Sequence, residues 1–398
     1  MADRVVRVKG FRWAGVRCGI KARGADLMLL VSDRPASAAG VLTRNVVASA
    51  PLQVTRAHLR SGVARAVVAN SGCSNVAMGA QGLRDANTMA ALAALSLRVK
   101  PAEVFVASTG VIGEPLPMAR IASGIPKAAA ALDASGIGVA ARAIMTTDSV
   151  PKVASANVKL GGTRCSVAGI AKGSGMLEPD MATMLSFVAT DAAVTPAVLR
   201  AIWREVADAT YNRVTVDGET STSDTALVLA NGASGAKPIA STSGKGAALL
   251  AGALLDVATE LAKMLARDGE GATKLVTVDV SGARSDAQAE AAGRRIANSL
   301  LVKTALFGGD PNWGRILQTV GAARVALNLA KTEVVLCGVP VFANGVSTGP
   351  GARRAAGKRM RASEISIAVS LGAGQGRARL WTCDLSYEYV RVNADYTT

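Results

Sequence analysis

Strand-like apolar runs alternate with helix-like segments along this chain, and that alternation limits the possible folds more than any other feature. Residues 66–70 and 103–108 are short apolar runs of the strand type. Residues 82–95, which lie between them, have the apolar spacing of a helix. Such an order predicts an α/β protein and argues against an all-helical or all-β one.

The second half of the chain continues the pattern. Residues 184–190 resemble a strand, and Thr195 and Pro196 then provide an N-cap and a first-turn proline for a helix that extends to about residue 209. A further helix is expected over residues 286–300. Four later runs alternate like hairpin strands: 324–328, 333–342, 364–371 and 377–383. The glycine-rich residues 372–376 are then expected to form a hairpin turn.

Composition limits the class of protein. The 398 residues are enough for two or three domain-sized cores, and the 50% hydrophobic content is typical of a globular chain. Because aromatic residues make up only 3%, the core is expected to consist of small aliphatic side chains in closely spaced elements. No internal repeat or long linker marks a domain boundary.

Several sites and locations are disfavoured. The cysteines form no C-x-x-C pair, so neither a zinc site nor a disulfide framework is expected; they are Cys18, Cys73, Cys165, Cys337 and Cys383. The apolar residues 246–265 are interrupted by Asp256, Glu260 and Lys263, which predicts a buried helix and not a membrane span. No apolar run of the secretory type follows Met1, so a cytoplasmic location is the default expectation.

The net charge of +16 raises the alternative of nucleic-acid binding. The densest basic run, residues 353–361, has no interleaved aromatic residues, and we interpret it as solvated surface. A basic field also attracts small anionic substrates.

One glycine-rich stretch, residues 172–185, carries candidate chemistry. It places Thr183 directly before a strand-like run, where an ordinary half-buried strand threonine is the simplest interpretation. The only histidine, His58, lies in a helix-like segment without a nearby acid, so any histidine-dependent nucleophile would rely on it alone. The other route is a threonine whose own α-amino group, freed by chain cleavage, acts as the base. Gly173 and Gly175 would permit the strained geometry that such a cleavage requires.

These residues belong to a series of motifs that occur in a familiar order. The series comprises residues 108–113, 144–148, 172–185, 212–220, 267–274, 310–315 and 393–398. It resembles the ornithine acetyltransferase family, the ArgJ-type enzymes of arginine biosynthesis. The resemblance implies a DmpA/ArgJ-like layered fold in which β-sheets pack between helices. It also implies self-cleavage between Ala182 and Thr183, giving pieces 1–182 and 183–398 that remain packed together.

The resemblance further implies a ping-pong reaction, in which Thr183 takes acetyl from N-acetylornithine and passes it to glutamate. The Thr109 hydroxyl and the Gly110 N–H would form the oxyanion hole. No cofactor is required, although acetyl-CoA remains open as a second donor. Two cleaved pairs would form a heterotetramer, and neither nucleic acid nor a membrane is an expected partner.

Substrate contacts follow from the same resemblance. They are Thr146, Lys172, Thr183, Glu270, Asn393 and Thr398. Thr147 is an alternative to Thr146, and Lys172 would pair with an amino-acid carboxylate. Glu270 lies at an expected helix end, where an acid opposes the helix dipole, and would bind the side-chain amine of ornithine. Tyrosines near the C-terminus indicate a packed tail.

Departures from the family pattern leave a second enzyme class open. Asp180 replaces the commoner asparagine before the cleavage point, and Glu178 adds another acid. The alternative is an N-terminal-nucleophile hydrolase, an aminopeptidase or amidase, in which water replaces glutamate as the acceptor.

Overall fold

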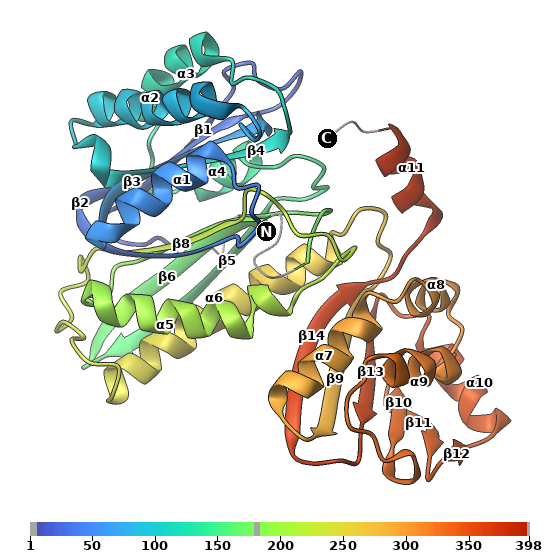
Figure 1. Ribbon diagram of the computed structural model, residues 1–398. Coiled ribbons are helices and arrows are strands. Elements are labelled where there is room, and N and C mark those ends of the chain that lie inside the picture. The colour runs from blue at the N-terminus through green and yellow to red at the C-terminus, as the bar shows by residue number, and fades with distance from the viewer. Residues whose placement is uncertain (1–5, 179–183, 396–398) are drawn as a thin grey trace. The chain divides into compact units, whose positions relative to one another are not determined.

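The computed structural model describes residues 6–178 and 184–395, which divide into two compact units (Figure 1). The first unit holds the described residues up to Asn212 together with Thr220–Leu261, and the second holds Arg213–Glu219 and the described residues from Ala262 onward. This division does not coincide with the predicted break after residue 182, which falls within the sequence of the first unit. The break therefore stays a prediction about chemistry.

The first unit is built on one long sheet. Its strands are β1 (Phe11–Val16), β2 (Leu27–Leu42), β3 (Val63–Cys73), β4 (Val104–Val111), β5 (Lys152–Leu160), β6 (Thr163–Lys172), β7 (Leu185–Thr190) and β8 (Thr225–Ala230). Their order is β4-β3-β2-β8-β7-β6-β5, and β1 pairs with β2. The strands predicted within β3, β4 and β7 are confirmed.

Strand β2 bends, and the sheet consequently forms two facing layers. Its first half pairs with β3 and its second half with β8, and the register shifts between Val31 and Ala36. Side chains from both halves meet in a shared core, including Phe105 from the β3–β4 layer and Phe187 from the β7–β8 layer. Small residues such as Ala168 fill the remaining space, as the low aromatic content predicts.

Helices pack on these layers, and the one formed by residues 137–143 contributes side chains to the shared core between them. They are α1 (Ala50–His58), α2 (Gly79–Leu97), α3 (Met118–Ala130), α4 (Ile137–Ala143), α5 (Pro196–Ala209) and α6 (Lys245–Arg267). Helices α2 and α3 lie on one side of the layered sheet, and α5 lies on the other (Figure 1). The predicted layered α/β architecture is confirmed. Pro196 opens α5 as expected, although Thr195 makes no side-chain cap hydrogen bond.

The only histidine has a structural role in this arrangement. Helix α1 runs along the edge strand β4, and His58 Nδ1 lies 2.8 Å from the Val104 carbonyl oxygen. Thr55 Oγ1 donates to the Val106 carbonyl oxygen at 2.6 Å and accepts from the Val106 N–H at 2.8 Å. Helix α1 thereby satisfies an edge that would otherwise expose unpaired backbone groups.

The second unit holds the other sheet. Its strands are β9 (Leu275–Ala283), β10 (Glu333–Leu336), β11 (Val339–Ala343), β12 (Val346–Ser347), β13 (Glu364–Ser370) and β14 (Gly376–Cys383), in the order β12-β11-β10-β13-β9-β14. Its helices are α7 (Asp286–Ala297), α8 (Leu300–Gly308), α9 (Trp313–Ala322), α10 (Pro350–Arg359) and α11 (Tyr387–Asp395).

Two local predictions in this unit are wrong, and a third is right about the helix but not about its end. The helix expected over 286–300 ends at Ala297, because Ser299 caps the separate helix α8 by accepting from the Val302 N–H. Residues 324–328 form no strand, and Arg324 adopts a left-handed φ of 56°. Residues 372–376 form no hairpin turn either. They join β13 to β14, but β9 lies between those two strands and pairs with both.

Two further observations concern surfaces. No helix within the described ranges is long and apolar enough to cross a membrane. The basic run lies on and just after α10, where Arg353 forms an exposed ion pair with Asp310 at 3.2 Å. Arg354 and Lys358 on the same helix are also exposed, which agrees with the interpretation as solvated surface.

Candidate active site

A buried lysine and a buried threonine meet across the two layers of the first unit. Lys172 ends β6 and Thr109 lies near the end of β4, and Lys172 Nζ donates to Thr109 Oγ1 at 3.2 Å. Both residues are almost fully buried, with exposed fractions of 2% and 3%. Since the Thr109 oxygen accepts from the ammonium group, its own hydrogen remains available to a third group.

Glycine is required at the neighbouring position. Gly110 has a φ of 131°, and a Cβ atom there would lie 2.3 Å from the carbonyl carbon of Gly72 on β3. Any side chain would push β3 and β4 apart, because real Cβ atoms do not approach backbone that closely. The close approach therefore fixes the backbone that follows Thr109.

Asp148 anchors the segments that carry two of the expected substrate contacts. Its Oδ1 accepts from Lys152 Nζ and from the Gly173 N–H, both at 2.7 Å, and its Oδ2 accepts from the Thr146 N–H at 3.0 Å. Burial raises the pKa of Asp148, but the charges of Lys152 and Lys172, together with these hydrogen bonds, outweigh that effect and lower it to about 2. An ionised carboxylate thus holds the chain next to Lys172.

The structure distinguishes the two candidate threonines. The Thr147 hydroxyl lies 2.7 Å from the Ser174 hydroxyl. Thr146 instead lines a cavity of about 380 Å³, which Lys21 and Arg142 also line. Thr146 thus lies at a cavity whose lining includes two cations, and such cations suit an anionic group.

Lys21 was missed by sequence reasoning. The buried Asp26 carboxylate accepts from the N–H groups of Gly19 and Lys21, both at 3.0 Å, and shapes the loop that carries Lys21. Lys21 Nζ then donates to the Met145 carbonyl oxygen at 2.8 Å. Burial lowers the pKa of Lys21, while the charges of Asp26 and Asp148 oppose that shift. A lysine between two strands gives no local signal of this environment.

The entry to β7 lies at the same end of the sheet as Lys172. Leu185, two residues after Thr183 in the sequence, pairs with Lys172. The Met184 N–H donates to Asp224 Oδ1 at 2.8 Å. Asp224 is fully buried, and this burial raises its pKa well above the usual range. Ala182 and Thr183 themselves lie outside the described residues, as does Thr398.

The remaining two candidates belong to the second unit, where they contact each other. Asn393 Nδ2, on α11, donates to Glu270 Oε2 at 2.8 Å. Helix α11 packs tightly on the turn after α6, since a Cβ atom on Gly271 would lie 2.5 Å from the Tyr389 nitrogen. The tail is thus a helix, but it is only partly packed, because Tyr387 is 86% exposed.

Metal chemistry finds no support within residues 6–178 and 184–395, where no three His, Cys, Asp or Glu side chains form a group able to hold a metal ion. The five cysteines are free, and Cys73, Cys165 and Cys383 are buried. The first unit instead offers ammonium groups, hydroxyls and a fixed glycine backbone. Such groups bind carboxylates and stabilise an oxyanion.

Comparison with known proteins identifies the family. The model of the ArgJ family matches residues 12–398. The arginine biosynthesis bifunctional protein ArgJ of Geobacter sulfurreducens is 46% identical over 394 residues, which cover 99% of this chain and 100% of the relative. The protein of the same name from Thermus thermophilus is 48% identical over 400 residues, with full coverage of both.

A solved structure agrees with this result. The crystal structure of arginine biosynthesis bifunctional protein ArgJ from Bacillus halodurans has a TM-score of 0.52 and 38% identity, and it covers 54% of this chain and 100% of its own. The family model, which matches residues 12–398, spans every motif that suggested the resemblance, from residue 108 to residue 398. The chain therefore belongs to the ArgJ family.

Proposed function

We propose that this protein transfers acetyl from N2-acetyl-L-ornithine to L-glutamate in arginine biosynthesis, through an acetyl ester on Thr183. Membership of the ArgJ family and the names of the relatives support this proposal. The single observation that carries it is the contact between Lys172 and Thr109 at the sheet end where β7 begins. An ammonium group and a hydroxyl are thereby placed close to the residue that follows the proposed nucleophile.

Self-cleavage would create the nucleophile. Thr183 Oγ attacks the carbonyl carbon of Ala182, the peptide C–N bond breaks, and an ester forms with a free Thr183 amine. Water then hydrolyses the ester, which leaves a carboxylate on Ala182 and both amine and hydroxyl on Thr183.

Acetyl transfer would use the new amine as the base. The amine takes the hydroxyl proton while Oγ attacks the acetyl carbonyl carbon, and the C–N bond to ornithine breaks as its nitrogen accepts the proton. The glutamate amine then attacks the acetyl ester and restores Thr183. In this proposal the Thr109 hydroxyl and the Gly110 N–H donate to the oxyanion in both halves.

Substrate binding would divide between cations and an acid. We assign the amino-acid carboxylate to Lys172, and we propose Thr146, which lines a cavity together with Lys21, as a further substrate contact. We assign the ornithine side-chain amine to Glu270, which accepts a hydrogen bond from Asn393, and we keep Asn393 and Thr398 as further proposed substrate contacts. The exchange needs no cofactor. Acetyl-CoA is proposed as an additional donor, and a cytoplasmic heterotetramer of two cleaved pairs as the assembly.

Mass spectrometry tests the proposal directly. The purified protein should consist of two pieces, and the C-terminal one should begin Thr-Met-Leu-Ser. N-acetylornithine alone should add one acetyl group to that piece under rapid quench, and glutamate should remove it faster than water does. Thr183→Ala should remain one inactive chain, whereas Thr183→Ser should still cleave and keep part of the activity.

The same measurement separates this function from its alternative. If acetate forms equally fast with and without glutamate, the protein is a hydrolase of the N-terminal-nucleophile type. If the wild-type chain stays whole and acquires no acetyl group, the threonine mechanism is wrong.

A further inference from the structure

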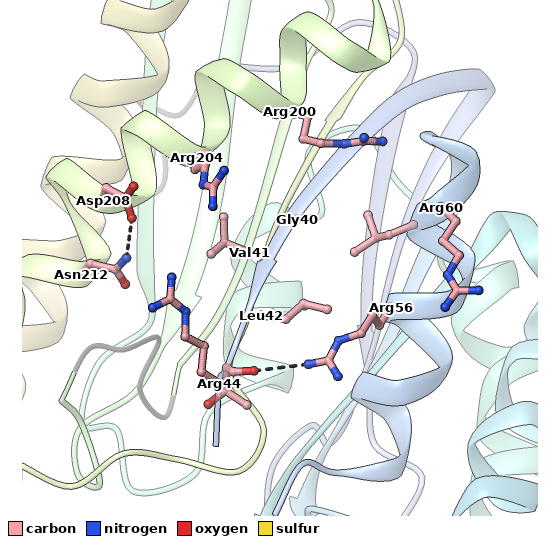
Figure 2. A pocket seen from close by; sticks show the side chains of 12 residues that line it. Gly40, Val41, Leu42, Arg44, Arg56, Arg60, Arg200, Arg204, Asp208 and Asn212 are labelled. Carbon is pink, nitrogen blue, oxygen red and sulfur yellow. Dashed lines mark hydrogen bonds between the residues drawn. The ribbon is translucent and has the colours of Figure 1, made fainter. Parts of the chain in front are cut away.

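An arginine-lined groove lies between α1 and α5, over the second half of β2. Figure 2 shows it from close by, with guanidinium groups projecting from both helices and from the end of β2. Its volume is about 830 Å³. Five arginines line it: Arg44, Arg56, Arg60, Arg200 and Arg204. Asp208 contributes the single carboxylate, so positive charge dominates the groove.

The arginines of the two helices come in pairs of like charge at helical spacing. Arg200 and Arg204 are four residues apart on α5, and Arg56 and Arg60 have the same spacing on α1 and the short turn of helix that follows it. Like charges at this spacing repel each other. All four side chains are exposed.

Few neighbours offset these charges. Arg56 donates to the Thr43 carbonyl oxygen at 3.3 Å. Within the described ranges, no acidic side chain forms an ion pair with Arg60, Arg200 or Arg204. Asp208, at one end of the groove, accepts from Asn212 Nδ2 at 2.8 Å. The guanidinium groups of Arg60, Arg200 and Arg204 are therefore open to a ligand.

The rest of the lining is apolar and lies close to the strand. Val41, Leu42 and Leu59 contribute aliphatic side chains. Gly40 allows this packing, because a Cβ atom there would lie 2.7 Å from Leu227 and 2.8 Å from Leu59. Planar guanidinium groups bind phosphate through paired N–H donors and stack on flat rings. The groove thus combines phosphate donors with surfaces for an uncharged planar group.

We propose that this groove binds a nucleotide that carries two or more phosphate groups. Its volume is that of a small-molecule site. A nucleic-acid strand fits less well, because such sites use aromatic platforms for successive bases and none of the lining residues is aromatic. The proposal does not depend on acetyl transfer, since binding of ADP, which is not a proposed substrate of that reaction, is measured directly.

Hydrogen bonds connect the groove to the candidate active site. Thr43, which lines it, donates its N–H to the Asp224 carbonyl oxygen at 3.1 Å. The Asp224 carboxyl group in turn accepts from the Met184 N–H at 2.8 Å. A ligand beside Thr43 is therefore two hydrogen-bonded residues away from the start of β7.

Calorimetric titration of the full-length purified protein at 50 mM salt tests the proposal, with inorganic pyrophosphate, ADP and coenzyme A as probes. ADP and coenzyme A should bind with submillimolar Kd, and coenzyme A more tightly, because it has three phosphate groups. The double variant R200A/R204A should weaken both by about tenfold or more, as should 300 mM salt. R200K/R204K keeps the charge but not the paired donors, and its Kd values should lie between those of wild type and R200A/R204A.

The control is R354A/K358A, which removes two exposed cations at the same spacing from α10 and should change Kd less than about twofold. Equal weakening by the control would show a general charge effect and overturn the proposal. So would the absence of heat from wild type at millimolar ADP, or pyrophosphate binding as tightly as ADP. Binding of a 12-nucleotide RNA without binding of ADP or coenzyme A would assign the groove to nucleic acid instead. Circular dichroism confirms that each variant is folded.

Discussion

Lys172 Nζ and Thr109 Oγ1 lie 3.2 Å apart although the two residues are 63 positions apart in the chain and belong to opposite sheet layers. The hydrogen bond fixes the direction of the threonine hydroxyl. Because the oxygen accepts from Lys172, the hydrogen points elsewhere, as an oxyanion donor requires. The pair thus connects the proposed substrate-binding cation to the proposed oxyanion-hole hydroxyl.

Thr109→Val tests this role by removing the hydroxyl with little change in volume. We expect kcat for acetyl transfer to fall by about 10²-fold, the usual loss for one oxyanion donor. Thr109→Ser keeps the hydroxyl and should retain most of the activity. The measurement is steady-state transfer by protein shown to be cleaved, and an unchanged kcat in the valine variant would remove Thr109 from the oxyanion hole.

Gly110→Ala should abolish transfer and destabilise the first unit, because its Cβ atom would collide with Gly72 and its φ of 131° does not suit alanine. Gly113→Ala is the matched control. It also has a positive φ, 82°, but no atom lies within 4 Å of the added Cβ. Thermal unfolding and transfer rate should both show a larger loss in Gly110→Ala. Equal losses would mean that backbone conformation alone, and not contact with Gly72, requires the glycine.

Asp148→Asn should lower the free energy of unfolding by about 3 kcal/mol, since it removes the buried counter-charge of Lys152. Asp33→Asn breaks the exposed ion pair with Arg12 and should change the free energy of unfolding by less than about 0.5 kcal/mol. Urea unfolding measures both. A small effect at position 148 would show that the neighbouring hydrogen bonds hold the segment without the charge.

The pH dependence of stability should report the same carboxylate. The pKa of Asp148 is about 2 in the folded protein and about 3.9 in an unfolded chain, so ionisation favours folding. This contribution, about 2 kcal/mol, is present above pH 4 and is lost as pH falls toward 2. The stability difference between wild type and Asp148→Asn should therefore shrink over that interval. A constant difference would contradict the lowered pKa.

Variants of Asp224 show whether this residue acts as a hydrogen-bond acceptor or as a charged group. Asp224→Asn keeps an oxygen for the Met184 N–H and removes an acid whose pKa burial raises, so self-cleavage should proceed at close to the wild-type rate. Asp224→Ala loses the acceptor and should slow cleavage by about tenfold, because the start of β7 is no longer held. The fraction of intact chain after expression and timed incubation gives both rates. Equal rates in the two variants would contradict this positioning role.

Glu270→Ala should raise KM for N-acetylornithine by about tenfold without stopping self-cleavage, since the acid is proposed to bind the substrate amine. Asn393→Ala removes the hydrogen bond that holds Glu270 and should cause a smaller rise. Transfer kinetics with purified, cleaved protein provide the check. If KM is unchanged in Glu270→Ala, the second unit contributes no charge to ornithine binding.

The sequence alone determined the elements whose signal is local. Apolar spacing predicted α2 and α5 because each helix buries one face with its own period, and continuous apolar runs predicted β3, β4 and β7 because these strands are buried on both faces. The same reasoning gave a wrong prediction where the structure depends on which strands pair with each other. Residues 372–376 have turn chemistry, yet β9, far earlier in the chain, separates the strands that they join.

The order of motifs also predicted the family and the candidate residues, including Thr109, Gly110, Lys172 and Glu270. It gave no role to Asp148 and missed Lys21 and Asp224 as site residues. Their importance comes from burial and from hydrogen bonds to distant segments, which no local pattern records.

Only the tertiary structure decided how these residues meet. The bend in β2 brings two sheet layers together, so that a lysine at the end of β6 reaches a threonine on β4. The tertiary structure likewise placed the arginines of α1 and α5 around one groove. Local residue spacing sets helices and strands, because their hydrogen bonds join near neighbours or follow a fixed period. Contacts between layers depend instead on which buried faces pack together, and that is determined by the whole chain at once.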